Sequence, residues 1–294
     1  MNILVTGGSG FVGWQVVCSL AADNQVDVAY SYHSNSVQHT NATALRVNLC
    51  DVDSVNRVIS SVNPDVVIHT AAMTDVDECE RSPTLARRVN TEGTKHVVDA
   101  CERNDASLVF VSTSFVFDGS RAEYRPDDHR DPINEYGHTK ADAERYVEAS
   151  NVSSAIVRTD QPYGKPTEWQ SPTMVQWILQ NVANGGPLPV FTDWYNQPTF
   201  LPDLRDAIIE IALTGKFETY HAVGPDYLSR YEWANIICDV FDYPVDRIVP
   251  SECLKADLPA TRPNVRLDRA QTESELNSTF LSVKSGLIEI RRVS

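Results

Sequence analysis

The sequence is poor in basic residues, and this shortage limits the partners that the protein can have. Its 294 residues include 40 Asp and Glu but only 25 Lys and Arg, of which six are Lys, so that the formal net charge is -15. Such a charge repels nucleic-acid backbones and anionic membranes, and we expect neither as a partner. A carboxylate-rich, lysine-poor surface suits a protein that works in high salt, and it equally suits an ordinary acidic enzyme of the cytosol.

Three further absences bear on the cellular location. The six cysteines form no C-x-x-C pair, which favours a reducing compartment. The N-terminal segment has no basic stretch typical of a signal peptide. No apolar run approaches the roughly 20 residues that a membrane span requires. We therefore expect a cytoplasmic globular protein, long enough for one broad domain or for a main domain with a smaller companion.

Strand-like and helix-like segments alternate along the first half of the chain. This alternation predicts an α/β fold, a Rossmann-type doubly wound parallel sheet. From residue 161 onward, frequent prolines break the chain into short pieces. We predict a dinucleotide-binding domain over 1–160 and a smaller substrate-binding region over 161–294, with about 200–224 returning to the main sheet. The strands are expected at 3–5, 26–30, 45–49, 64–72, 107–111, 155–158 and 220–223.

A glycine-rich turn follows the first predicted strand. Gly7, Gly10 and Gly13 allow a tight turn, close approach of a pyrophosphate and close packing of a helix on the strand, although a merely structural turn would also use them. The second strand ends in residues 31–36 without an acidic side chain to hold a ribose 2′-hydroxyl, so His33 and its hydroxyl neighbours favour NADPH over NADH. After the third strand, Asp51 would meet the adenine, or it would cap the following helix.

Tyr136 and Lys140 lie four residues apart in a predicted helix, hence on one face. A lysine charge beside a phenol lowers its pKa, so that the hydroxyl could give a proton to a carbonyl as hydride arrives. The same spacing also occurs by chance on solvated helices. The hydroxyls of residues 112–114 follow a buried strand and would either point into the ligand crevice or cap a turn.

These motifs resemble those of the extended short-chain dehydrogenase/reductase family, and within it the chain is most similar to the dTDP-4-dehydrorhamnose reductases. The matching stretches run in order across almost the whole chain. They are 71–74 with Val76, Asp77 and Glu80; 112–113 with 116–119; 134–140; 158–159 with 163–164; Asp193 with 198–199; and 262–264 with 267–268.

The resemblance, together with the motifs, implies a role for each candidate residue. Thr113 would bind the reacting carbonyl, Tyr136 would donate the proton and Lys140 would hold the nicotinamide ribose. The cofactor, NADPH or NADH, would contact Gly7, Gly10, Phe11, Val12, His33, Asp51, Val52, Ala71, Ala72, Met73, Tyr136 and Lys140. The nucleotide-sugar substrate would contact Thr74, Thr113, Ser114, Gln161 and Arg262, unless Arg262 is a surface arginine that ends a loop. The catalytic site would hold no metal, whereas a homodimer with Mg²⁺ at its subunit interface is an expectation from some relatives.

The implied reaction is reduction of dTDP-4-dehydro-L-rhamnose to dTDP-L-rhamnose, a precursor of surface glycans. Two departures leave the exact sugar open: Ser114-Phe115 stands where the family usually has Asp-Tyr, and residues 160–162 read Asp-Gln-Pro in place of Ser-Trp-Val. A nucleotide-sugar epimerase or dehydratase is an alternative. A non-catalytic regulatory subunit of methionine adenosyltransferase is another, against which the presence of Thr113, Tyr136 and Lys140 weighs.

Overall fold

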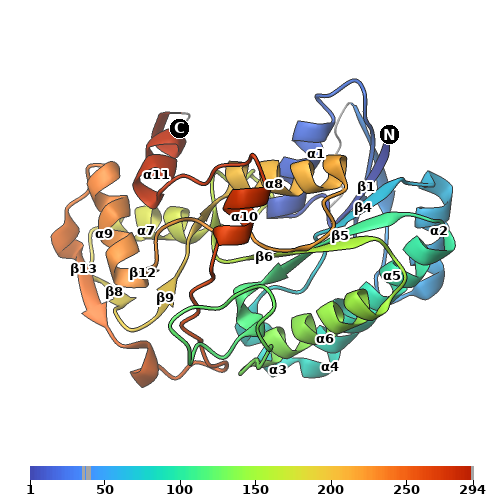
Figure 1. The fold of residues 1–294 in the computed structure, drawn as a ribbon. Coiled ribbons are helices and arrows are strands. Elements are labelled where there is room, and N and C mark those ends of the chain that lie inside the picture. Colours follow the sequence, from blue (N-terminus) through green and yellow to red (C-terminus); the bar gives the residue numbers. More distant parts are fainter. Residues whose placement is uncertain (35–36, 38–40, 293–294) are drawn as a thin grey trace.

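The computed structural model describes residues 1–34, 37 and 41–292, and it has a seven-stranded parallel sheet at its centre (Figure 1). The strand order is β11-β6-β5-β4-β1-β2-β3, and every neighbouring pair is parallel. This is the Rossmann order with β11 added at one edge, which confirms the predicted fold class. The strands are β1 (Asn2–Thr6), β2 (Asp27–Tyr32), β3 (Ala42–Arg46), β4 (Val66–His69), β5 (Ser107–Thr113), β6 (Ser154–Thr159) and β11 (Thr219–His221).

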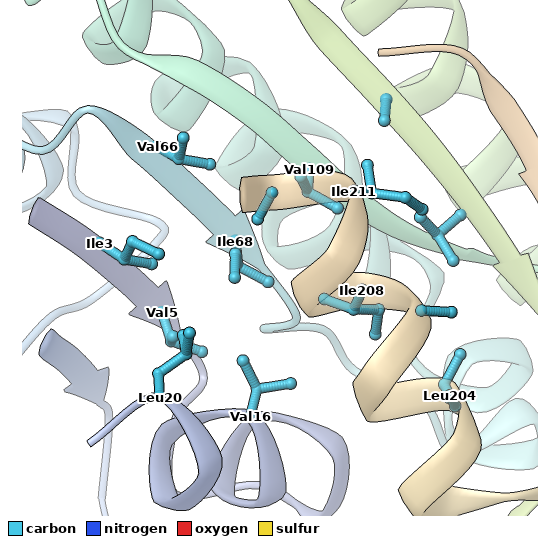
Figure 2. Close-up of a cluster of buried hydrophobic side chains, with 14 of the residues drawn as sticks. Ile3, Val5, Val16, Leu20, Val66, Ile68, Val109, Leu204, Ile208 and Ile211 are labelled. Atoms are coloured by element: carbon cyan, nitrogen blue, oxygen red, sulfur yellow. The ribbon is translucent and has the colours of Figure 1, made fainter. Parts of the chain in front are cut away.

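Helices cover both faces of the sheet, because the central strands carry apolar residues on both sides. On one face, α1 (Phe11–Leu20) and α8 (Leu201–Thr214) pack against side chains of β1, β4 and β5, as Figure 2 shows. On the other face lie α2 (Val52–Val62), α5 (Gly93–Arg103) and α6 (Glu135–Ala149), with a second buried cluster beneath them. Although α8 and β11 come late in the chain, they therefore complete the core of the main sheet.

The C-terminal region forms a separate apolar cluster beside the carboxyl edge of the sheet (Figure 1). Three helices enclose it: α7 (Met174–Ala183), α9 (Arg230–Val240) and α11 (Val283–Arg292). The proline-rich chain contributes three short two-stranded sheets, because proline interrupts longer ladders. These sheets are β7 (Pro162–Tyr163) with β10 (Thr199–Phe200), β9 (Tyr195–Asn196) with β12 (Leu228–Ser229), and β8 (Leu188–Phe191) with β13 (Ile248–Ser251).

The remaining helical segments are short and lie in the connections. They are α3 (Val76–Arg81), α4 (Pro83–Ala86), the π-helix η1 (Arg87–Glu92), the 3₁₀ turns η2 (Ser114–Val116), η3 (Val245–Arg247) and η4 (Cys253–Lys255), and α10 (Ala270–Glu275). Within the described ranges, no helix has both the length and the apolar character needed to cross a membrane.

Candidate active site

Two adjoining cavities lie along the carboxyl edge of the sheet, where the strand order reverses between β1 and β4. Their volumes are about 380 and 600 Å³, and both are lined by Gly7, Gly10, Thr70 and Ala72. Open α/β sheets bind ligands at this kind of position. The shared wall makes the two cavities one elongated crevice, which suits a dinucleotide with a second ligand at one end.

The glycine turn between β1 and α1 forms the middle of the crevice. Gly7 has a φ of +69°, and a Cβ there would lie 2.7 Å from the Cα of Ala71. A Cβ on Gly13 would lie 2.4 Å from the carbonyl oxygen of Gly7. Gly10 is the N-cap of α1 and has no side chain to occupy the helix end, so the first amides of α1 are free to face an anion. The turn therefore has the geometry of a pyrophosphate site.

The larger cavity is lined by the end of β2, by residues 48–50 and by one side of α4 and η1. His33 lies in this lining as predicted, and the described residues of the lining include no Asp or Glu. Two cations that sequence analysis missed are close by: Arg88 lines the cavity, and Nε of Arg46 donates to the carbonyl oxygen of His33 at 3.2 Å. Pairing of β2 with β3 brings Arg46 opposite Tyr32. Asn35 and Ser36 of the predicted phosphate-binding stretch lie outside the described residues.

Asp51 and Val52, which we predicted to contact the cofactor, are not in the lining of this cavity. The strand β3 ends at Arg46, three residues earlier than the predicted end at residue 49. Residues 48–50 therefore line the cavity in place of Asp51 and Val52. The Asp51 carboxylate accepts from the backbone N–H groups of Asp53 and Ser54 and caps α2. The helix-cap alternative is therefore the one that the structure supports.

Thr113, Tyr136 and Lys140 meet at the smaller cavity, although they come from two separate elements. The end of β5 delivers Thr113, and Asn134 starts α6 by accepting the backbone N–H of Gly137 at 2.8 Å. This cap places Tyr136 in the first turn and Lys140 one turn later, both buried. The Tyr136 hydroxyl hydrogen-bonds to Thr113.

The predicted lowering of the Tyr136 pKa by Lys140 is wrong for this structure. Burial raises the pKa of Tyr136, and the hydrogen bond to Thr113 opposes the rise only in part. The ammonium of Lys140 instead donates to the carbonyl oxygen of Val111 at 2.9 Å and lies 4.0 Å from the centre of the Phe110 ring. Burial also lowers the pKa of Lys140 to about 7. Tyr136 is therefore a protonated phenol at neutral pH and can act as an acid.

The segment from Ala71 to Met73 lines the crevice and is held by Asn90, whose part sequence analysis missed. Asn90 Oδ1 accepts from the N–H of Met73 at 2.7 Å, and Asn90 Nδ2 donates to the carbonyl oxygen of Met73 at 2.9 Å. Asn90 is buried in the π-helix η1, a distortion that often occurs at functional sites. Only the fold brings this side chain to the end of β4.

The predicted substrate residues divide into two groups. Thr74 and Gln161 line the smaller cavity. Ser114 and Arg262 are not in its lining: Ser114 is buried and hydrogen-bonds to Asp160, and Arg262 is ion-paired with Asp77 at 2.8 Å. The Arg262 side chain is only 9% exposed, so it is not the surface arginine of the alternative interpretation.

No group of three or more His, Cys, Asp or Glu side chains in residues 1–34, 37 and 41–292 is arranged to hold a metal ion. The predicted Mg²⁺ between subunits stays a prediction.

The chain is similar to several known proteins. A family model described as RmlD substrate binding domain matches residues 1–290. The probable low-salt glycan biosynthesis reductase Agl14 of Haloferax volcanii is 29% identical and aligns over 98% of this chain and 96% of its own. A dTDP-4-dehydrorhamnose reductase of Aggregatibacter actinomycetemcomitans is 30% identical over 81% of this chain and 78% of its own.

Solved structures show the same fold. A dTDP-4-dehydrorhamnose reductase from Clostridium acetobutylicum has a TM-score of 0.85 and 26% identity, covering 100% of this chain and 99% of its own. The relatives also include methionine adenosyltransferase 2 subunit beta of Pongo abelii, which is 27% identical over 93% of this chain and 82% of its own length.

Proposed function

The chain belongs to the RmlD family, and from this we propose that it reduces the 4-keto group of a dTDP-linked deoxysugar with a nicotinamide cofactor. The observation that carries the proposal is the meeting of Thr113, Tyr136 and Lys140 in one cavity that continues to the glycine turn. The two dTDP-4-dehydrorhamnose reductases above make dTDP-4-dehydro-L-rhamnose the first substrate to test.

The residues of the smaller cavity divide the chemistry between them. A reduced nicotinamide, when bound, supplies the hydride that reaches the carbonyl carbon. Tyr136 gives its hydroxyl proton to the carbonyl oxygen, and burial ensures that the phenol is protonated before the reaction. Thr113 hydrogen-bonds to the Tyr136 hydroxyl and orients it. Lys140 reaches the same cavity from the next turn of α6 and would hold the ribose of the cofactor.

We propose NADPH as the preferred cofactor. Three observations support this: no carboxylate is among the described residues that line the larger cavity, His33 and Arg88 line it, and Arg46 contacts the end of β2. A carboxylate would repel a 2′-phosphate, whereas a guanidinium binds one. Arg46→Gln should weaken the binding of NADPH about 10- to 100-fold while that of NADH changes little, since a hydrogen bond to a charged group contributes about 1.5–3 kcal/mol. Equal losses for both cofactors would refute this assignment.

Oxidation of NADPH in the presence of dTDP-4-dehydrorhamnose tests the proposed activity. Tyr136→Phe should lower kcat by about 10²- to 10⁴-fold, the usual contribution of a general acid, with little effect on cofactor binding. Tyr146→Phe is the matched control, because Tyr146 lies on the same helix but hydrogen-bonds to Asp99 outside the cavity. It should behave like the wild type.

Two other outcomes would refute the reductase. If the protein retains NAD through purification and converts sugar nucleotides without net oxidation of NADPH, it is an epimerase or a dehydratase. If it turns over no keto sugar but binds a methionine adenosyltransferase, it is a regulatory subunit of the kind named among its relatives. The homodimer and the Mg²⁺ between subunits belong to the same proposal, and size-exclusion chromatography with and without a chelator tests both.

A further inference from the structure

Asp160 carries a carboxyl group into the cavity that holds Thr113 and Tyr136. It follows directly after β6, and only 3% of the residue is exposed. One carboxylate oxygen accepts from the backbone N–H of Gln197 at 2.8 Å, and the side chains of Ser114 and Asn196 hydrogen-bond to the same group. Burial raises the pKa of Asp160 to about 6, so the group is ionised at neutral pH. The reaction described above gives it no role.

Polar atoms around Asp160 lack partners. Three side chains near Asp160, each at least nine-tenths buried, have an atom without a hydrogen bond to any described residue: Thr159 Oγ1, which lines the cavity, and Asn196 Oδ1 and Arg230 Nε, whose side chains interact with Asp160. Arg230 also makes no ion pair with a described residue, although its charge acts on Asp160. Buried polar groups are almost always paired, so several unpaired ones together indicate a missing ligand.

The chemistry of these groups indicates which ligand. Asp160 and Asn196 offer acceptors, and the Thr159 hydroxyl can donate or accept. A phosphate or another anion would be repelled by Asp160, and a cation would be repelled by Arg230. Neighbouring hydroxyl groups satisfy both kinds of partner, because each hydroxyl donates one hydrogen bond and accepts others. The wall therefore fits a sugar ring.

We propose that Asp160 is a specificity-determining residue, which accepts a hydrogen bond from the sugar hydroxyl next to the reacting carbonyl, and that Arg230 is a positioning residue behind it. This inference rests on the proposed reduction of a nucleotide-linked keto sugar. It assigns a role to Asp160, which stands where the family usually has Ser. A site built around a substrate hydroxyl discriminates strongly against analogues that lack it.

The surroundings of Arg230 explain how it can act on Asp160 without touching it. Its guanidinium lies 4.1 Å from the centre of the Trp194 ring and 5.5 Å from that of Trp233. Ser229 and Glu232 form a capping box that fixes the start of α9, where Arg230 is the first residue. Burial lowers the pKa of Arg230 to about 10, so it stays charged at neutral pH. The guanidinium is thus a fixed positive charge near the carboxylate.

The test compares Asp160→Asn with the wild type on two nucleotide-linked 4-keto-6-deoxysugars that differ only in the hydroxyl at C3. We expect kcat/KM to fall roughly 10- to 100-fold for the hydroxylated sugar, mostly through KM, and less than about threefold for the 3-deoxy sugar. Asp203→Asn is the matched control, since the Asp203 carboxylate also has a pKa raised by burial and also accepts one backbone N–H, from Leu281 at 2.7 Å. This variant should leave kcat/KM unchanged for both sugars. Equal losses for both sugars in Asp160→Asn would overturn the proposal.

Calorimetric binding separates this inference from the proposed reaction. Asp160→Asn should weaken the binding of dTDP-L-rhamnose at least about tenfold but leave that of dTDP alone unchanged, because only the first carries the sugar. If the wild type oxidises no cofactor with any keto sugar, the proposed reaction fails, yet this difference in binding would still support the inference. If Asp160→Asn binds both ligands like the wild type, the inference is wrong, whatever the protein catalyses.

Discussion

Replacement of Asn90 with alanine should free the segment that separates the two cavities. Asn90 makes two hydrogen bonds to the backbone of Met73 and donates a third to Thr139 Oγ1 at 3.1 Å. Alanine at this position would leave the N–H and the carbonyl of Met73 without these partners. The variant tests whether a buried amide far along the chain sets the shape of the cofactor site.

The expected loss of stability follows from the N–H and the carbonyl of Met73, which both lose a partner. Leaving a buried polar group unpaired costs about 1–3 kcal/mol, and Met73 is only partly buried, so we expect the free energy of unfolding to fall by about 2–4 kcal/mol. For a chain of this size, that lowers Tm by about 4–8 °C. Cofactor binding must then order the loosened segment again, at about 1–2 kcal/mol for one residue, so the Kd should rise roughly 5- to 30-fold.

Thermal denaturation and titration of NADPH into the apo protein provide the two measurements. Asn104→Ala is the control, because Asn104 also donates to a backbone carbonyl, that of Ala100 at 2.7 Å, and does not line either cavity. It should lower Tm only slightly and leave cofactor binding unchanged. If Asn90→Ala lost stability but bound NADPH as tightly as the wild type, the proposed link between Asn90 and the cofactor site would be wrong.

Three further predictions concern the glycine turn after β1, the buried ion pair between Glu144 and Arg158, and the protonation of Lys140. Gly13→Ala should weaken NADPH binding in titrations, because its Cβ would push the glycine turn open, whereas Gly186→Ala, with open space around it, should not. Glu144→Gln should cost about 3–5 kcal/mol in urea denaturation, because it leaves the buried Arg158 without the carboxylate that accepts from it at 2.7 Å; a loss below 1 kcal/mol would contradict this. Since the pKa of Lys140 falls to about 7 on folding, the unfolded state binds more protons between about pH 7 and 10, and the stability of the wild type relative to Lys140→Met should rise across that range.

Local patterns determined much of the fold and part of the site. The glycine turn and the Tyr136–Lys140 pair depend on neighbours in one strand-turn-helix or one helix, so their spacing was visible in the sequence. The alternation of buried strands and helices gave the parallel sheet for the same reason. The end of β3 was placed three residues too far along, because apolar residues continue past the last paired residue of the strand. Asp51 caps α2, as one of the two alternatives stated, and its contact with the cofactor stays a prediction.

The tertiary structure alone decided the remaining contacts and the protonation states. Arg46 reaches His33 because β3 pairs with β2, and Asn90 reaches Met73 because a helix packs beside the end of β4. In neither pair does the separation along the sequence indicate a contact. The sequence suggested that Lys140 would acidify Tyr136. In the folded protein both groups lose their water, and burial favours the neutral form of each, so the phenol keeps its proton and the pKa of the lysine falls.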